Sequence, residues 1–314
     1  MSDAQDAHSP TGFADMRPLP GGWSGRTFLA EAGGERTVVR VHEPEDRDGP
    51  TREAAVLALA AAALEGCAPV PGVVEVREGD PASGAPGLLL TEHLPGERGD
   101  LLLPRLDEQG LSSAGAALGE VVARLAGTVQ PRPGRFVGAA LEIAEWEPPR
   151  DAELVVELGA ALAPRLGLEA GEVRELVALC RHADDVLGEP LGAVLVHGDL
   201  NPKNVLLEQG PDGAVRVSGV LDWEFAHAGT VGADLGNLVR FDRAPAYVDA
   251  VLGTVAQRRG VDEPTLLERA RAVDLVAVME LATRRGTNPV AERAHRQLVA
   301  MVRAGDLHAT ADAP

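Results

Sequence analysis

The chain has 314 residues, 45% of them hydrophobic, and its formal net charge is −19. A chain of this length can bury one large core or two modest lobes. The negative charge argues against nucleic-acid binding, which needs a basic face, and no apolar run is long enough to cross a bilayer.

The other global features predict a cytoplasmic protein. Cys67 and Cys180 lie far apart and outside any metal-binding spacing, which indicates reduced thiols. The first residues, MSDAQDAHSPTG, lack the basic start and the apolar stretch of a secretory signal. We expect a cytoplasmic monomer or homodimer, with no nucleic-acid or membrane partner.

The N-terminal part has the pattern of a small sheet with one helix. Residues 1–15 are expected to form a flexible tail. Two alternating, β-branched stretches at 26–32 and 36–42 flank Gly33-Gly34 and predict a hairpin. The next segments predict a helix over 51–66, with Thr51 as its N-cap, and strands over 70–78 and 87–94.

Beyond residue 95 the spacing of apolar residues becomes helical, except for a strand-rich block at 194–225. A strand-rich small lobe followed by a helix-rich large lobe is an α+β, two-lobed pattern. We therefore expect an N-lobe over 16–94, a C-lobe over 95–306 and a second flexible tail over 307–314. Helical spacing covers residues 112–129, 150–167, 170–188, 245–260, 263–286 and 290–304.

A polar loop interrupts two apolar segments in VLVHGDLNPKNVLL, residues 194–207. Its pattern is H-G-D-x-x-x-x-N, and Asp222 follows in the next strand pair. Phosphoryl transfer needs an oriented hydroxyl and neutralised phosphate charge. Asp199 can accept the hydroxyl proton, while Asn204 and Asp222 can hold Mg²⁺ against the phosphates. An Asx-type turn at Asp199 is the purely structural alternative.

At these residues the chain resembles the aminoglycoside phosphotransferase family, a branch of the protein-kinase-like fold. HGDLNPKN is similar to the catalytic loop of that family and VLDWE to its metal-binding segment. The resemblance implies a bilobal fold, with an antiparallel-sheet N-lobe containing one helix and a larger, mainly helical C-lobe. It also implies ATP or GTP as phosphate donor, Mg²⁺ as cofactor, and a small-molecule hydroxyl as acceptor.

The resemblance further implies a phosphate clamp in the N-lobe. Arg40 stands where the family carries its phosphate-binding Lys, and Glu53 would orient it through an ion pair. A guanidinium can bond two phosphate oxygens, so the exchange keeps the function. An exposed Arg and a Glu favoured by the helix dipole are the alternative.

Other parts of the nucleotide site follow from the same resemblance. The glycine-rich segment 20–28 would cover the phosphates, although a plain hairpin turn explains its composition equally well. Backbone groups in the hinge between the lobes, residues 88–97, would bind the base of the nucleotide. These nucleotide-binding candidates are Gly22, Ser24, Gly25, Thr91 and His93.

The C-lobe supplies loop-support and acceptor candidates. We expect His197 to support the loop through hydrogen bonds, and Asp234 to do so from the start of a helix, as its cap. Lys203, the chain's single lysine, faces either the transferred phosphate or solvent. Further acceptor-binding candidates are Glu224 beside Asp222, and Asp274 and Glu280 on one helix, for which a solvated helix face is the alternative.

The sequence therefore predicts a Mg²⁺-dependent small-molecule kinase. A hydroxylated antibiotic is the leading acceptor, and phosphorylation would inactivate it; a choline-, homoserine- or sugar-like metabolite is the alternative. A kinase-shaped regulator without catalysis is a third interpretation. A dinuclear phosphatase using Asp222 and His227 is disfavoured, because the further His and Asn motifs it needs are missing from the sequence.

Overall fold

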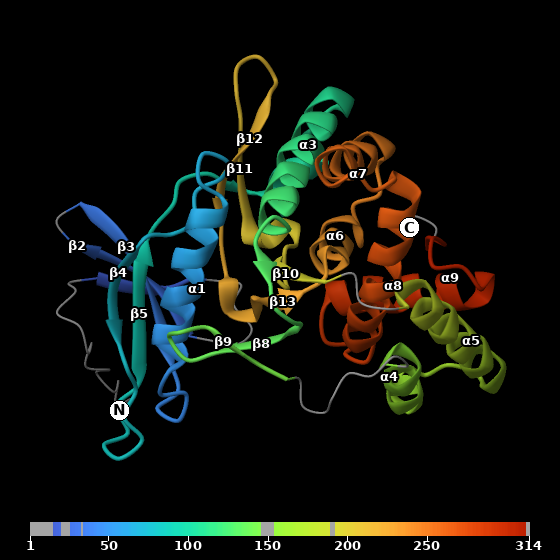
Figure 1. The fold of residues 1–314 in the computed structure, drawn as a ribbon, viewed down its shortest axis with the longest axis horizontal. Helices are drawn as coiled ribbons and strands as arrows, with labels where there is room; N and C mark the ends of the chain where they lie inside the picture. The colour runs from blue at the N-terminus through green and yellow to red at the C-terminus, as the bar shows by residue number, and fades with distance from the viewer. Residues whose placement is uncertain (1–14, 20–25, 33, 146–153, 189–191, 312–314) are drawn as a thin grey trace, which may run out of the picture.

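The computed structural model describes residues 15–19, 26–32, 34–145, 154–188 and 192–311. These residues form a strand-rich and a helix-rich part, shown on the left and right of Figure 1. The glycine-rich candidates Gly22, Ser24 and Gly25 lie outside the described residues. In the part of the chain that is described, no helix is long and apolar enough to span a membrane.

The N-terminal part is an antiparallel sheet with strand order β1-β2-β3-β5-β4. The predicted hairpin is present as β2 and β3, and the next two predicted strands are also found. Alternation places Val39, Leu88 and Leu90 in a small core of their own. The strands are β1 (Asp15–Pro18), β2 (Arg26–Ala32), β3 (Glu35–His42), β4 (Val73–Arg77) and β5 (Gly87–Glu92).

Helix α1 (Gly49–Ala63) packs on this sheet and buries Leu57 and Ala60. It begins two residues before the predicted start. Asp48, not Thr51, is the N-cap residue, and the Thr51 hydroxyl donates to the Asp48 carbonyl at 2.9 Å. Pro50 suits the first turn, because its missing N–H would have no partner there.

The start of α1 also contacts the C-terminal part. The backbone N–H of Gly138, in the turn between β8 (Gly134–Val137) and β9 (Glu142–Ala144), donates to Oδ2 of Asp48 at 3.2 Å. The β8–β9 hairpin runs below α1 in Figure 1. The helix that carries Glu53 is therefore bonded to both parts of the fold.

The C-terminal part combines helices with two small antiparallel sheets, ordered β7-β10-β13-β8-β9 and β12-β11-β6. The helices predicted from apolar spacing are all present within the described residues. The first elements are β6 (Glu97–Arg98), α2 (Gly99–Leu102), η1 (Leu103–Arg105), α3 (Glu108–Leu125), β7 (Val129–Gln130), β8 (Gly134–Val137), β9 (Glu142–Ala144), α4 (Leu154–Leu162), η2 (Ala163–Arg165) and α5 (Ala170–Leu187). The rest are β10 (Ala193–Val196), η3 (Pro202–Asn204), β11 (Val205–Gln209), β12 (Val215–Val220), η4 (Trp223–Phe225), β13 (His227–Gly229), α6 (Val231–Val239), α7 (Pro245–Arg259), α8 (Glu263–Ala282) and α9 (Pro289–Ala304).

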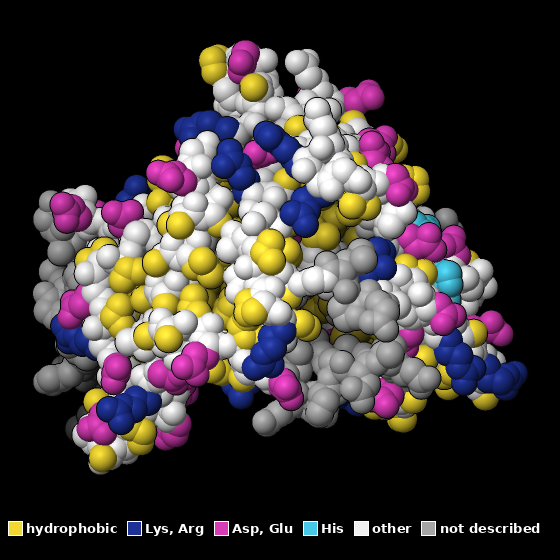
Figure 2. Space-filling view, in the orientation of Figure 1, with side chains coloured by type: hydrophobic (Ala, Val, Ile, Leu, Met, Phe, Trp, Pro, Cys, Tyr) yellow, Lys and Arg dark blue, Asp and Glu magenta, His cyan; other side chains and the backbone are white. Residues whose placement is uncertain are grey.

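Two large hydrophobic clusters and a small one, made of Ala126, Val194 and Val196, lie in this part. The larger runs from α1 through α3 and β10 to α7, and the second lies among α4, α5, α8 and α9. Leu307 belongs to the second cluster with 1% of its surface exposed, and the His308 carbonyl accepts a hydrogen bond from Arg243. The expectation of a loose tail from residue 307 is therefore wrong for these two residues. Figure 2 shows acidic side chains spread among basic ones over the outer face.

Candidate functional site

The polar loop is held between buried strands, as its apolar flanks predict. All four residues of β10 are buried, and the chain leaves this strand at His197 and turns at Gly198, where φ is +81°. A Cβ atom at Gly198 would collide with the Phe225 carbonyl oxygen, so this turn requires glycine. The turn points the next residue, Asp199, out of the core.

The Asp199 carboxylate accepts hydrogen bonds from side-chain amide groups of its own loop. Nδ2 of Asn201 donates to its Oδ1 at 2.8 Å, and Nδ2 of Asn204 donates to its Oδ2 at 2.9 Å. Burial raises the pKa of Asp199, while the bond from Asn201 opposes that rise. A carboxylate held in place with a raised pKa is a better proton acceptor.

His197 is a neutral support and not a base. Its ring is buried and stacks near Trp223, with centroids 4.5 Å apart. Nε2 lies 2.8 Å from the Leu221 carbonyl, and Nδ1 accepts the Asp199 N–H at 3.2 Å. Burial lowers the pKa of His197 to about 4, so the ring is uncharged near neutral pH.

Asp234 stabilises the loop through hydrogen bonds, but it is not the helix N-cap residue that the sequence predicts. It lies inside the first turn of α6, whose N-cap residue is Thr230. Its two carboxylate oxygens accept the backbone N–H groups of His197 at 2.9 Å and Gly198 at 3.0 Å. Burial raises the pKa of Asp234 to about 7, and these two bonds oppose the rise.

A second supporting chain of bonds was not predicted. Nδ2 of Asn237 donates to the Gly198 carbonyl at 3.3 Å, and Arg240 donates to Oδ1 of Asn237 at 2.7 Å. Arg240 also pairs with Asp274 at 2.6 Å. The sequence does contain a signal for these bonds. Asn237 and Arg240 follow Asp234 at intervals of three residues, which places all three on one helix face.

Asp274 fits neither of its two interpretations, which were acceptor binding and a solvated helix face. It is 5% exposed and bonded to Arg240, so it is neither on a solvated face nor open to a cationic acceptor. Burial within an ion pair satisfies its charge. Glu280 is exposed on the same helix, in agreement with the solvated alternative, and Lys203 is also exposed.

Arg40 joins the N-lobe to the segment after β12. Its Nη1 lies 3.2 Å from Oε1 of Glu53 and 2.7 Å from Oδ1 of Asp222, and its Nη2 pairs with Glu224. Only 14% of the Arg40 side chain is exposed. The three carboxylates keep the guanidinium charged despite its burial. Burial raises the pKa of Glu53 to about 7, against the pull of Arg40.

The acidic excess at this point fits a divalent cation. Three carboxylates face one guanidinium, and Asp222 and Asn204 offer the oxygen donors that Mg²⁺ prefers. Asp222 adopts a left-handed backbone, φ 62° and ψ 66°, a strained state often found at functional sites. Among the described residues, no group of three His, Cys, Asp or Glu side chains has metal-binding geometry, so donor chemistry alone supports a cation here.

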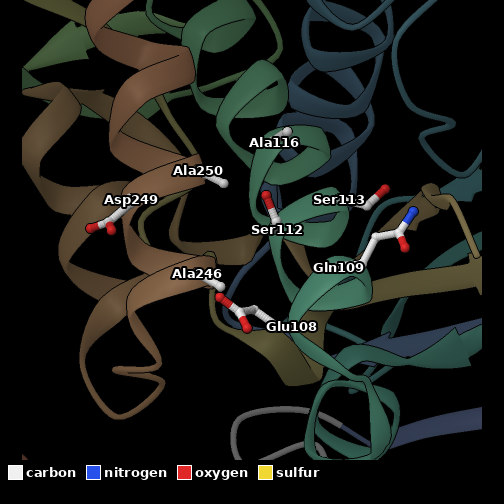
Figure 3. Close-up of a pocket in the computed structure, with 8 residues that line it drawn as sticks. All are labelled: Glu108, Gln109, Ser112, Ser113, Ala116, Ala246, Asp249 and Ala250. Atoms are coloured by element: carbon white, nitrogen blue, oxygen red, sulfur yellow. The ribbon is translucent and has the colours of Figure 1, made fainter.

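A cavity of about 520 Å³ adjoins this cluster. Its walls include Arg40, Glu53, Glu224 and the half-exposed ring of Phe225. A second, shallower depression of about 830 Å³ lies between α3 and α7, away from the loop; Figure 3 shows its lining, which includes Glu108 and Asp249. Of the predicted site residues that the structure describes, Arg40, Glu53 and Glu224 line the first cavity, whereas Asp199, Asn204 and Asp222 lie outside its lining. The second depression is lined by no predicted site residue within the described part of the chain.

The hinge candidates lie at the end of the first sheet. Thr91 is in β5, opposite Val38, and His93 follows the strand. Burial and nearby Arg36 lower the pKa of His93, and its buried Nδ1 has no hydrogen-bond partner among the described residues. The binding of a nucleotide base by backbone groups near Thr91 and His93 stays a prediction.

Comparison with known proteins supports the same family. The model of the phosphotransferase enzyme family (APH) matches residues 15–273. Aminoglycoside phosphotransferase APH(4)-Ia is 21% identical, with a TM-score of 0.64, over 93% of this chain and 94% of that chain. The GDP and kanamycin complex of APH(2″)-IIIa is 16% identical, with a TM-score of 0.68, over 94% and 95%.

A relative of another kind has the same fold. A putative fructosamine-3-kinase from Haemophilus somnus 129PT is 18% identical, with a TM-score of 0.61, over 92% of this chain and 91% of that chain. No curated protein matches the chain. The α+β, two-lobed architecture expected from the sequence is confirmed by these neighbours. The chain belongs to the phosphotransferase enzyme family and has its protein-kinase-like fold.

Proposed function

We propose that this phosphotransferase moves the γ-phosphate of ATP or GTP to a hydroxyl group of a small molecule. The observation that carries the proposal is the position of Asp199, fixed by two amide donors at the end of a buried strand. Such a carboxylate can orient the acceptor hydroxyl and take its proton. The hydroxyl oxygen then bonds to the γ-phosphorus, the bond to the β-phosphate bridging oxygen breaks, and the nucleoside diphosphate leaves.

The proposed donor site uses the cluster around Arg40. Arg40, oriented by Glu53, binds phosphate oxygens, and Asn204 and Asp222 hold Mg²⁺. When bound, the cation neutralises the charge on the phosphates. Relatives named as complexes with ADP and hygromycin B, and with GDP and kanamycin, support a nucleotide donor and a small acceptor.

For the acceptor, we propose an antibiotic that is inactivated by O-phosphorylation. The aminoglycoside phosphotransferases among the structural neighbours favour this class. A metabolic acceptor is the second candidate, and the putative fructosamine-3-kinase favours it. A silent regulator is less consistent with the site, because Asp199, Asn204 and Asp222 are all retained.

The test is turnover of ATP and GTP, each with Mg²⁺, against a panel of hydroxylated antibiotics and metabolites. Phosphate added to one antibiotic, seen by mass, would establish resistance chemistry, whereas turnover with a metabolite alone would assign a metabolic role. Chelation with EDTA should abolish turnover. Tight nucleotide binding with no turnover across the panel would instead favour the regulator.

A further inference from the structure

Arg271 on α8 is a buried cation, and the carboxylate whose charge acts on it, Asp274, is bonded to Arg240. Arg271 is 4% exposed, and it takes part in none of the ion pairs within the described residues. Its Nη1 donates to the Val239 carbonyl, while its buried Nε has no hydrogen-bond partner in the part of the chain that the structure describes. Burying a charge without a partner costs several kcal/mol. Such a group therefore needs an explanation beyond packing.

A second guanidinium lies beside it. Among the described residues, Arg243, in the segment after α6, bonds only carbonyl oxygens: its Nε donates to Arg240 at 3.2 Å and its Nη1 to His308 at 3.0 Å. The two guanidinium groups donate to the carbonyls of consecutive residues, Val239 and Arg240. Burial, and next the charge of Arg243, lower the pKa of Arg271 to about 9. The nearby carboxylate of Asp274 is bonded to Arg240.

Arg240 links the pair to the catalytic loop. Arg240 is bonded to Asn237, which donates to the Gly198 carbonyl, and its charge acts on Asp199. Arg243 follows Arg240 by three residues and is partly exposed, so solvent reaches it. A ligand group at Arg243 would thus sit on the C-lobe side of the loop, where an acceptor must approach Asp199.

We propose that Arg243 and Arg271 bind a carboxylate or similar oxyanion carried by the acceptor. This inference rests on the proposed phosphotransferase function and narrows its substrate class. Guanidinium groups bind carboxylates through paired, charge-assisted hydrogen bonds. The nearby carboxylate of Asp274 is already paired with Arg240. A polycationic aminoglycoside would meet two cations here, whereas a hydroxy acid would neutralise them.

The binding test uses sulfate as the oxyanion probe. The full chain is saturated with AMP-PNP and Mg²⁺ so that the donor site is filled, and its Tm is followed as sodium sulfate replaces sodium chloride at constant ionic strength. We expect a saturable rise in Tm. Arg243→Gln should abolish it. Arg216→Gln, which removes an exposed guanidinium on β12, is the matched control and should retain it.

Arg271→Met gives an independent result. Replacing an unpaired buried charge with an apolar side chain should raise Tm in chloride and remove the response to sulfate. A wild-type chain with no saturable response would overturn the proposal, as would an unchanged response in Arg243→Gln. A lower Tm for Arg271→Met in chloride would show that the guanidinium is satisfied without a ligand, and would overturn it as well.

The kinetic arm asks whether the acceptor carries the oxyanion. Matched hydroxy acids and their primary amides, such as glycerate and glyceramide or serine and serinamide, are compared with kanamycin. We expect kcat/KM to be at least about tenfold higher for the acid of a pair, and Arg243→Gln to remove that preference through KM. Preference for amides or kanamycin would overturn the acceptor assignment. Nucleotide binding and slow hydrolysis by water test the phosphotransferase function separately.

Discussion

Nη1 of Arg40 lies 2.7 Å from Oδ1 of Asp222, which joins β3 to the segment after β12 across 182 positions of sequence. The carboxylate proposed to hold Mg²⁺ is thus bonded to the cation proposed to hold the phosphates. Glu224 and Glu53 complete the cluster. Binding of a metal nucleotide has to redistribute these bonds, so the cluster should respond strongly to changes at Arg40.

Arg40→Gln should weaken both folding and nucleotide binding. It leaves three carboxylates without their cation, and breaking a buried pair costs about 3–5 kcal/mol. Arg40→Lys keeps the charge but loses the forked geometry, so it should recover only part of each loss. Thermal unfolding and nucleotide titration measure the two effects. Nucleotide affinity of wild-type strength in Arg40→Gln would contradict the clamp.

Asp199→Ala should remove transfer while nucleotide affinity stays nearly unchanged. Losing a positioned proton acceptor lowers rates by about 10²–10⁴-fold. Turnover is followed with any acceptor that the panel identifies. The control is Asp249→Asn, in the depression between α3 and α7, which should behave as wild type. A rate within about tenfold of wild type would exclude this role for Asp199.

His197 should make folding sensitive to acid. Its folded pKa of about 4 lies below the usual 6.5, so the unfolded chain binds the proton more tightly. The stability from the neutral ring is fully present above the unfolded pKa and is lost as pH falls toward 4. The shift corresponds to about 3 kcal/mol.

The measurement for His197 is urea unfolding of wild type and His197→Gln at several pH values. Other titrating groups contribute to both chains and largely cancel in the difference. The free energy of unfolding of wild type, relative to the variant, should fall through this pH window. A constant difference would mean that the ring is not held neutral by burial.

Gly198→Ala should cost more than a glycine replacement in an open turn. Both Gly198 (φ +81°) and Gly213 (φ +84°) are left-handed, which costs an alanine about 1–2 kcal/mol. At Gly198 the new Cβ also meets the Phe225 carbonyl, whereas Gly213 has nothing within 4 Å. Unfolding of both variants isolates the collision. Equal losses would show that the loop shifts freely.

Local chemistry explains why the sequence predicts so much of this site. His197, Asp199 and Asn204 lie in one loop, and the hairpin that follows fixes the separation to Asp222. The number of residues between these side chains therefore determines how they lie relative to one another. The sheet and helices follow for the same reason, since alternation and helical spacing are local signals.

What the sequence did not predict depends on packing between distant helices. Arg240 and Asp274 meet only because α6 and α8 pack together, and nothing near either residue indicates its partner. That Arg271 forms no ion pair within the described residues likewise depends on which helices pack around it. Helical spacing marked Asp274 as a polar position but could not show which way that position faces.

The bond from Gly138 to Asp48 has a consequence for motion of the two lobes. The start of α1 is bonded to the β8–β9 turn, and Glu53 on the same helix is bonded through Arg40 to Asp222 and Glu224. These bonds add to the packing of α1 in the larger hydrophobic cluster. When the lobes rock, the start of α1 should stay with the C-lobe, and the sheet should move relative to it only as far as the bonds from Arg40 to Glu53 and Asp222 allow. Hydrogen exchange would then locate the hinge at the β3–α1 connection as well as after β5.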